Sequence, residues 1–315
     1  MKELKIVFMG TPGFAVGVLQ KIITEEFHVV GVVTAPDKPA GRGQKVHESD
    51  VKVFATQNNL PVWQPTSLKD PVFLEQLKSS GVNCQVVVAF RMLPEQVWRL
   101  PEFGTFNLHA SLLPQYRGAA PINWALMNGE TETGVTTFFI DDKIDTGAII
   151  LKESTSVDPD ENAGSLHDRL MDLGGDLVVK TLQLISNDQV QTQLQEENGF
   201  LKPAPKLNKE NCKIDWSLSG TEIKNHIRGL SPYPGAWCEL VNGEKREIVK
   251  IYKTDFKSES HDSVFGTILS DKREIKVAVL DGWIHILEIQ LAGKRKMGAR
   301  ELLNGYQFPE GSTLK

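Results

Sequence analysis

The sequence predicts an α/β protein: a doubly wound, Rossmann-like domain followed by a small C-terminal β-barrel of the OB type. In the first part, short apolar strands alternate with amphipathic helices, which is the pattern of a parallel sheet covered by helices. In the last third, short strands follow one another without intervening helices, which favours a small closed barrel. The length of 315 residues is sufficient for two domains with separate cores.

We expect the boundary between the two domains in a polar stretch. Residues 187–208 lose the apolar periodicity and include LKPAPKL at 201–207, which is typical of an interdomain linker. The prediction is therefore a catalytic domain at residues 1–188, a linker at 189–207 and a C-terminal barrel domain at 208–315.

The first domain opens with a strand, a glycine turn and a helix. Residues 5–10 (KIVFMG) are an apolar strand, Gly10-Thr11-Pro12-Gly13 forms the turn, and helical spacing runs over residues 14–23. The turn lacks the G-x-G-x-x-G pattern. No acidic residue follows the second strand, residues 28–34, at the position that binds a ribose. Dinucleotide binding is therefore not expected.

The remaining elements follow from the same periodicities. In the first domain we expect helices at 49–58, 71–79, 119–127 and 163–186, and strands at 85–90, 106–109, 134–140 and 148–152. In the second we expect a helix at 220–229 and strands at 236–241, 248–256, 264–269, 275–280 and 283–291. The dipeptides Asn242-Gly243 and Asp281-Gly282 are candidate hairpin turns.

Composition indicates a cytoplasmic protein. The hydrophobic fraction is 40% and the charged fraction 24%, and no apolar run reaches the length of a membrane span or of a signal-peptide core. The three cysteines, Cys84, Cys212 and Cys238, are scattered, which argues against a disulfide framework and against a zinc site. We therefore expect no metal, no membrane partner and no obligate protein partner.

The net charge of −5 is unevenly distributed. Residues 201–315 contain 19 Lys and Arg against 15 Asp and Glu, whereas residues 1–200 contain 16 against 25. A positive carboxyl-terminal part on an acidic protein is a weak indication of a nucleic-acid partner, because scattered lysines are common on any surface.

The candidate site lies at the end of the strand at 106–109. Side chains alternate along a strand, so Asn107 and His109 point to the same side, at the carboxyl end where open α/β sheets bind ligands. An amide that binds an oxyanion beside an imidazole that transfers a proton is suited to acyl transfer. For this short pattern alone, the commoner alternative is that Asn-x-His simply closes a strand and bonds to its own loop.

The residues around Asn107 and His109 favour the catalytic interpretation. The run NLHASLLP at 107–114, followed by Gly118 and by Asp145-Thr146-Gly147, resembles the folate-dependent formyltransferases. The likeness extends from the Gly10-Thr11-Pro12 turn to the carboxyl-terminal domain. With RGAAPI at 117–122, it is strongest to the members that act on tRNA.

The resemblance implies an activity and roles for three residues. It implies transfer of the formyl group of 10-formyltetrahydrofolate to the α-amino group of the methionine on charged initiator tRNA, for translation initiation. Asn107 and His109 would stabilise the tetrahedral oxyanion, and Asp145 would orient His109 and stabilise its protonated form. Asp145 is preferred to Asp141 and Asp142 because it alone matches the family's Asp-x-Gly position. The other two are interpreted as solvated.

The resemblance also implies a binding site for the folate donor. Its expected lining is Phe90, Leu93, Ser111, Leu112, Leu113 and Pro114. Here the sequence departs from the commoner pattern, because Phe90 stands where Tyr is usual and the loop before Pro94 is one residue shorter. Phe90, Met92 and Leu93 fit a plain apolar core equally well.

Positive residues give the candidate tRNA contacts. Lys38, Arg42 and Lys45 lie in a loop rich in Pro and Gly, which is either a plain surface loop or a basic finger for phosphates. The members that act on tRNA carry a similar insertion, with an arginine at the position of Arg42. Lys206 and Lys209, near the linker, and the basic cluster at 294–296 complete the prediction.

Two alternatives stay open. The same catalytic domain serves formyltransferases whose acceptor is an amino-sugar or a ribonucleotide amine, although the basic loop and the barrel favour tRNA. A non-catalytic RNA-binding protein on a decayed transferase fold is the alternative from another class, and the presence of Asn107, His109 and Asp145 argues against it.

Overall fold

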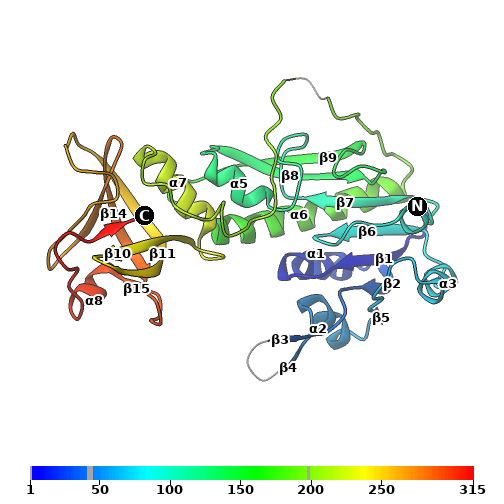
Figure 1. Cartoon of the computed structure of the whole chain (residues 1–315). Helices are drawn as coiled ribbons and strands as arrows, with labels where there is room; N and C mark the ends of the chain where they lie inside the picture. The colour runs from blue at the N-terminus through cyan, green and yellow to red at the C-terminus, as the bar shows by residue number, and fades with distance from the viewer. Residues whose placement is uncertain (1, 41–44, 197–198) are drawn as a thin grey trace. The chain divides into compact units, whose positions relative to one another are not determined.

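The structure is a computed structural model, and it describes residues 2–40, 45–196 and 199–315 (Figure 1). The chain divides into two compact units. The first comprises Met1–Pro121, Thr133–Thr155 and His167–Pro203, and the second comprises Ile122–Glu132, Ser156–Leu166 and Ala204–Lys315. Two short segments that precede residue 167 thus belong with the carboxyl-terminal unit.

The first unit is built on a seven-stranded sheet with the order β5-β2-β1-β6-β7-β8-β9. Strands β5, β2, β1, β6 and β7 are parallel, and β8 is antiparallel to β7. The predicted doubly wound, Rossmann-like class is therefore confirmed. The strands are β1 (Lys5–Gly10), β2 (His28–Val33), β5 (Val62–Trp63), β6 (Cys84–Val88), β7 (Thr105–His109), β8 (Glu132–Phe139) and β9 (Ile149–Ser156).

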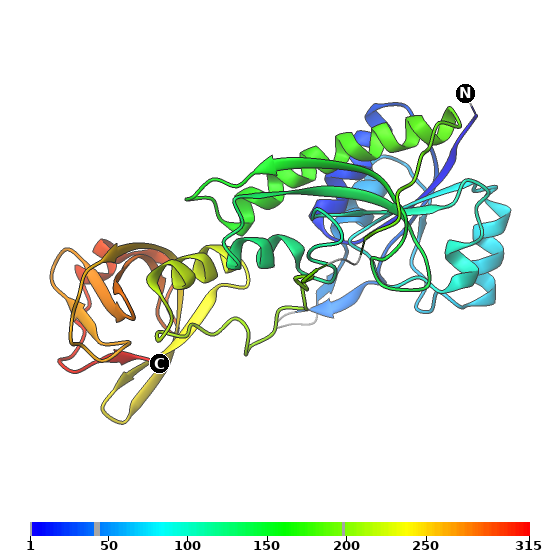
Figure 2. The same cartoon turned by 90° about the horizontal axis from the view of Figure 1, so that it is seen from above.

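Helices cover both faces of this sheet (Figure 2). On one face, α1 (Gly13–Thr24) and α6 (Ala163–Ser186) pack side by side, since a Cβ on Gly17 would lie 2.6 Å from Met171 Cγ. On the other face, α3 (Pro71–Ser79) and α4 (Glu95–Trp98) bury Leu77 and Val97 against Val7. The helix α2 (Asp50–Gln57) contacts α1.

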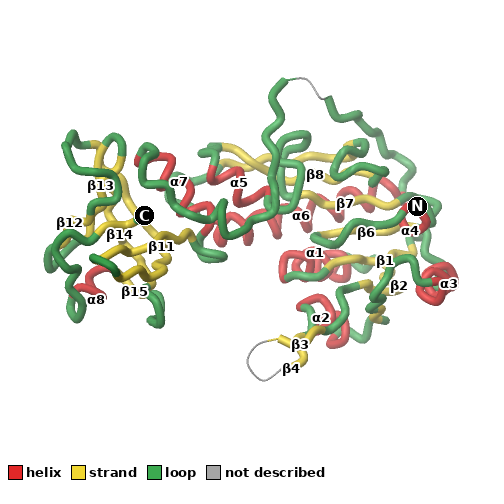
Figure 3. Tube along the Cα trace, in the orientation of Figure 1, coloured by secondary structure: helices red, strands yellow, loops and turns green. Residues whose placement is uncertain are grey.

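The second unit contains an antiparallel barrel (Figure 3). Its strand order is β12-β13-β14-β11-β10-β16, and β15 pairs with β14. A bridge between Thr267 and Thr313 and a hydrogen bond from Leu314 N to Gly266 O (2.8 Å) join the two edges. The strands are β10 (Ala236–Asn242), β11 (Lys245–Ser258), β12 (Ile268–Ser270), β13 (Ile275–Val279), β14 (Gly282–Gln290), β15 (Met297–Gly298) and β16 (Thr313–Leu314).

Local contacts stabilise the helices of this unit. In α7 (Gly220–Leu230), Ser219 and Glu222 form a capping box that satisfies backbone donors at the helix start. The side chain of Asn123, on α5 (Pro121–Met127), donates to Gly229 O at 2.8 Å and so ties the segment 122–132 to α7. The short α8 (Ala299–Leu303) buries Leu302 in the barrel core.

Most predicted elements are confirmed with shifts of at most four residues at their ends, whereas the strand predicted at 264–269 overlaps β12 (Ile268–Ser270) in only two residues. The hairpin turns and the shortest strands also differ from the prediction. The hairpin between β13 and β14 pairs Val279 with Gly282, so its turn residues are Leu280 and Asp281 rather than Asp281 and Gly282. The hairpin between β10 and β11 likewise pairs Asn242 with Lys245, so its turn residues are Gly243 and Glu244 rather than Asn242 and Gly243. The strands β3 (Lys38–Ala40), β4 (Lys45–His47), β5, β15 and β16 were not predicted, because two or three residues are too few to show a periodicity.

Candidate active site

The two central residues of the site lie on β7. Asn107 is paired with Val87 of β6 and Phe138 of β8, so the strand is held on both sides. His109 is only 6% exposed, whereas Asn107 is half-buried. The side chain of Asn107 has no hydrogen-bond partner in the described part of the chain, so its amide is available to a ligand.

The protonation pattern of His109 follows from its backbone partner. His109 Nε2 lies 2.8 Å from the carbonyl oxygen of Tyr116. A carbonyl only accepts hydrogen bonds, so Nε2 carries the hydrogen and Nδ1 is the unprotonated nitrogen of the neutral ring. Nδ1 is therefore the position at which the ring takes up a proton.

Asp145 lies next to that nitrogen. Its Oδ2 is 3.9 Å from His109 Nδ1 and accepts a hydrogen bond from Gly118 N at 3.0 Å. The separation is too long for a direct hydrogen bond, and the predicted pairing is electrostatic in this geometry. Asp145 has a positive φ of 56°, and a Cβ on Gly147 would lie 1.7 Å from Phe139 O, so the Asp-Thr-Gly turn requires its glycine.

The turn is held by a residue that the sequence did not indicate. Gln195 Nε2 donates to Asp145 O and to Gly147 O, both at 2.9 Å. Its Oε1 accepts from Arg117 Nε at 3.1 Å and from Nη2 at 2.9 Å. Gln195 thereby joins the loop after β7 to the loop that carries Asp145. It lies in a polar segment without a motif, so no sequence signal marked it.

The segment around Gln195 belongs to the same unit as the site. Gln193 and Ile149 exchange backbone hydrogen bonds of 2.8 and 2.9 Å, and Tyr116 N donates to Lys202 O at 2.7 Å. Lys202 N donates in turn to Gln115 Oε1 at 2.8 Å. Part of the predicted linker therefore packs along the site loops, and the domain boundaries given above stay a prediction.

The prediction that Asp141 is solvated is wrong. Asp141 is half-buried and its Oδ1 accepts from Thr146 Oγ1 at 2.8 Å and from Lys143 N at 3.0 Å. Asp141 thus holds the turn that positions Asp145. The expectation is confirmed for Asp142, which is exposed.

The four predicted folate residues of the loop after β7 differ in exposure. Ser111 and Leu113 are buried, at 0% and 1% exposure, whereas Leu112 and Pro114 are half-buried. Leu112 and Pro114 are accordingly the two whose side chains reach the surface of this loop. Contact with a folate stays a prediction for all four.

Buried hydrogen bonds fix that loop. Ser111 Oγ donates to Gln115 O and Thr136 Oγ1 donates to Ser111 O, both at 2.7 Å. The ammonium of Lys152 donates to Leu113 O, and burial lowers the pKa of Lys152 from its ordinary value. The loop is therefore held by strands β8 and β9 before any ligand binds.

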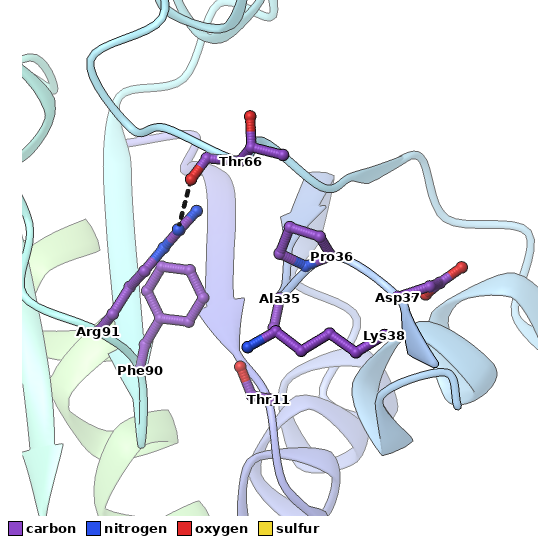
Figure 4. A pocket seen from close by; sticks show the side chains of 8 residues that line it. All are labelled: Thr11, Ala35, Pro36, Asp37, Lys38, Thr66, Phe90 and Arg91. Carbon is purple, nitrogen blue, oxygen red and sulfur yellow. Dashed lines mark hydrogen bonds between the residues drawn. The ribbon is translucent and has the colours of Figure 1, made fainter. Parts of the chain in front are cut away.

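A cavity of about 560 Å³ opens at the carboxyl ends of β1, β2 and β6 (Figure 4). Phe90 lines it and is half-buried, whereas Leu93 is buried in the core against α3 and α4. The cavity lining is Thr11, Ala35, Pro36, Asp37, Lys38, Thr66, Phe90 and Arg91. Strand β7 follows β6 in the sheet, so Asn107 and His109 lie at the same carboxyl end of the strands as the cavity. They are not part of its lining.

The predicted tRNA contacts are distributed over both units. Arg42 lies outside the described residues, and Lys45 begins strand β4. Lys206 and Lys209 are exposed. The Trp237 ring has Lys209 Nζ at 5.2 Å and Lys213 Nζ at 5.5 Å from its centroid, and its Nε1 donates to Lys209 O. Two cations within 5.5 Å of one indole ring give the barrel unit a local concentration of positive charge.

The basic cluster at 294–296 is partly neutralised. Lys296 Nζ forms an ion pair with Glu288 at 2.9 Å and lies 5.3 Å from the Tyr252 ring centroid. Arg295 forms an ion pair with Glu301. These two residues are therefore weaker candidates for phosphate binding than Lys209 and Lys213.

Residues 2–40, 45–196 and 199–315 contain no group of three or more His, Cys, Asp or Glu side chains arranged to hold a metal ion. Within the same ranges, no helix is both long enough and apolar enough to span a membrane.

Together the fold and the site define a class of enzyme. A free amide and an imidazole with one unprotonated nitrogen, beside a carboxylate at the carboxyl edge of a Rossmann-like sheet, suit transfer of a small acyl group. Residues 4–182 match the family described as formyl transferase, and residues 206–307 match the formyl transferase C-terminal domain. The chain belongs to the formyl transferase family.

Full-length relatives indicate which members of this family the chain resembles. The chain is 59% identical, over 314 residues and the whole of both chains, to a methionyl-tRNA formyltransferase of Flavobacterium johnsoniae. It is 50% identical to the methionyl-tRNA formyltransferase of Bacteroides thetaiotaomicron, with 99% of each chain covered.

Solved structures share the fold. The sugar 3N-formyl transferase WlaRD, solved with dTDP and 5-N-formyl-THF, is 23% identical with a TM-score of 0.66, over 94% of this chain and 100% of that one. HypX from Aquifex aeolicus, solved with tetrahydrofolic acid, is 16% identical with a TM-score of 0.65, over 96% of this chain and 47% of that one.

Proposed function

We propose that this protein transfers the formyl group of 10-formyltetrahydrofolate to the α-amino group of methionine on charged initiator tRNA. The acceptor is supported by the full-length relatives at 50% and 59% identity, which are methionyl-tRNA formyltransferases. The observation that carries the chemistry is the position of Asp145 Oδ2, 3.9 Å from the unprotonated nitrogen of His109, on the strand that also bears Asn107.

The reaction needs an oxyanion site and a proton acceptor. The free amine attacks the formyl carbon, a C–N bond forms, and the carbonyl oxygen becomes an oxyanion. Asn107 donates to that oxygen through its unengaged amide. When the tetrahedral intermediate collapses, the bond from carbon to the folate nitrogen breaks and tetrahydrofolate leaves.

His109 is placed to handle the proton. An α-amino group titrates at about 7.7, so a sizeable share is a neutral nucleophile near neutral pH. Nδ1 of His109 accepts the proton that the amine loses on attack. The resulting cation keeps its bond from Nε2 to Tyr116 O and is stabilised by the Asp145 carboxylate. It then returns the proton to the folate nitrogen that leaves.

The donor is supported by the structural neighbours. WlaRD was solved with 5-N-formyl-THF and HypX with tetrahydrofolic acid, and both share this fold. We propose that the folate contacts Phe90, Leu112 and Pro114, which are the half-buried members of the predicted lining. Leu93, Ser111 and Leu113 would then shape the pocket from the core.

The charged tRNA is a polyanion, so its binding requires unneutralised cations. We propose Lys206, Lys209 and Lys213 on the barrel unit, with Trp237 beside the last two, and, from the sequence alone, Arg42 and Lys45. Initiator tRNA is used in the cytoplasm, and this function therefore places the protein there.

A formyltransferase with an amino-sugar acceptor is the second candidate. It is favoured by the likeness to WlaRD, which spans that whole chain. At 23% identity, however, that likeness concerns the fold, whereas the relatives at 50% and above are tRNA enzymes.

The test is incubation of the purified protein with methionine-charged initiator tRNA and labelled 10-formyltetrahydrofolate, with amino-sugar nucleotides as the competing acceptors. We expect label on the tRNA and a binding affinity that falls steeply with salt. Arg42→Ala should lower kcat/KM for tRNA and leave folate binding unchanged. Lys209→Ala should mainly weaken tRNA binding. Label on an amino-sugar, with none on tRNA, would establish the second candidate instead.

A further inference from the structure

A single lysine, Lys52, binds residues at both ends of the hairpin β3–β4. Asp37 precedes β3 and Glu48 follows β4, and Lys52 Nζ forms an ion pair with Glu48 Oε1 at 2.7 Å and a closer one with Asp37 Oδ2. Lys52 is in the first turn of α2, where Ser49 Oγ caps the helix by accepting from Lys52 N at 3.1 Å. The two ends of the hairpin are thus fixed to one helix.

Other partners make this arrangement specific. Gln64 Nε2 donates to Asp37 Oδ1 at 2.7 Å and to Ala35 O at 2.8 Å, so both carboxylate oxygens of Asp37 are engaged. The side chains of Lys52 and Asp37 are 21% and 27% exposed. The hydrogen bond with Lys52 lowers the pKa of Asp37, and the same bond raises the pKa of Lys52, so both are charged at neutral pH.

The next residue after Asp37 reaches the cavity described above. Lys38 lines it, and its ammonium points inward near Thr11, with Phe90 and Arg91 across the space (Figure 4). Because Asp37 is taken by Lys52, it does not neutralise Lys38, which has no acidic partner among residues 2–40, 45–196 and 199–315. Arg91 Nη1 donates to Thr66 O at 3.0 Å, an uncharged partner, so this second cation also keeps its charge.

We propose that Lys38 binds a phosphate of the terminal nucleotide of the acceptor tRNA, and that Lys52 is the positioning residue that keeps Lys38 in place by holding Asp37 and Glu48. This inference rests on the proposed function. A phosphate is favoured over a carboxylate of the folate donor because the sequence at 38–47, KPAGRGQKVH, has three cations and no acidic residue. Such a segment suits a polyanion.

Four variants test the two roles. Lys52→Met removes the ion pairs at similar side-chain volume, Lys52→Arg restores the charge, and Lys38→Ala removes the phosphate contact. Lys180→Met is the matched control, because it removes an exposed ion pair with Glu153 (3.2 Å) elsewhere in the first unit. For each, the measurements are kcat, the KM values for charged initiator tRNA and for 10-formyltetrahydrofolate, and the melting temperature.

We expect Lys52→Met to raise the KM for tRNA about tenfold with kcat within about twofold of wild type and an unchanged KM for the folate. Lys52→Arg should recover most of this loss. Lys38→Ala should raise the same KM and flatten the salt dependence of tRNA binding by about one unit. Because Lys38 and Lys52 act on one contact, the double variant Lys38→Ala with Lys52→Met should have a KM for tRNA no higher than that of Lys38→Ala alone. Lys180→Met should match wild type.

Three outcomes would overturn the inference: an unchanged KM for tRNA in folded Lys52→Met, a rise in the folate KM in its place, or full additivity in the double variant. If Lys52→Met does not fold, Asp37→Asn and Glu48→Gln keep the side-chain shapes and carry the same expectation. Wild-type protein that fails to formylate tRNA would instead refute the proposed function.

Discussion

Replacing Asp145 by Asn isolates the charge that faces His109. Asn keeps the shape and one oxygen that accepts from Gly118 N, a bond of 3.0 Å in the native protein, so the turn is preserved. The carboxylate lies 3.9 Å from His109 Nδ1, and the two side chains are 15% and 7% exposed. At that distance and an effective dielectric constant of about 20, two opposite unit charges attract each other by about 4 kcal/mol, which is the largest contribution that Asp145 can make to positive charge developing on the ring in the transition state.

That energy sets the expected effect. A tenfold change in rate corresponds to about 1.4 kcal/mol, and part of the lost interaction is recovered by the amide dipole, so kcat should fall about 10²- to 10³-fold. The assay is single-turnover formylation of charged initiator tRNA at saturating folate. Asp142→Asn is the matched control, because Asp142 is exposed and its loss should leave kcat unchanged. An Asp145→Asn variant that folds and keeps more than about a third of wild-type kcat would refute the electrostatic role.

Three further predictions use other contacts of the structure. Asn107→Ala should lower kcat about 10²- to 10³-fold with little change in the melting temperature, since its amide has no partner in the described chain. Gln195→Leu removes the hydrogen bonds of 2.9 Å to Asp145 O and Gly147 O and the two bonds from Arg117, and should lower kcat about tenfold or more while leaving the folate KM nearly unchanged. Burial raises the pKa of the Cys84 and Cys238 thiols to about 12, so at pH 8 about 10⁻⁴ of each is thiolate. A thiol reagent should therefore label Cys84 and Cys238 in the native protein only at the rate of unfolding, and rapid labelling of either thiol would contradict that burial.

The sequence was informative where chemistry is carried by side chains in a regular element. Asn107 and His109 could be placed on one side of a strand end, because side chains alternate along a strand and the strand is apolar on both sides of them. Asp145 could be placed only through the family motif, because an Asp in a turn is ordinary turn chemistry. The helix at 163–186 was predicted to the residue because its apolar spacing persists over 24 residues.

The sequence was uninformative where backbone atoms or long-range backbone pairing make the contact. The atom that fixes the tautomer of His109 is the backbone oxygen of Tyr116, and any residue at position 116 supplies such an oxygen. Gln195 acts because Gln193 pairs with Ile149 and so brings a polar segment back along β9. No local pattern encodes that return, since long-range pairing depends on the completed sheet.

From these contacts we expect the site to be sensitive to substitutions at positions distant from the chemistry. Its reactive groups come from β7 and from the turn before β9. The two are joined through Gln195 with Arg117 and through the bond from Gly118 N to Asp145, and not through a direct bond between His109 and Asp145. A Coulomb interaction falls off gradually with distance, so a separation of 3.9 Å tolerates small movements that would break a hydrogen bond. The oxyanion contact of Asn107 has no such tolerance, because it depends on hydrogen-bond geometry. Loosening the turn should therefore reduce catalysis less than displacing β7.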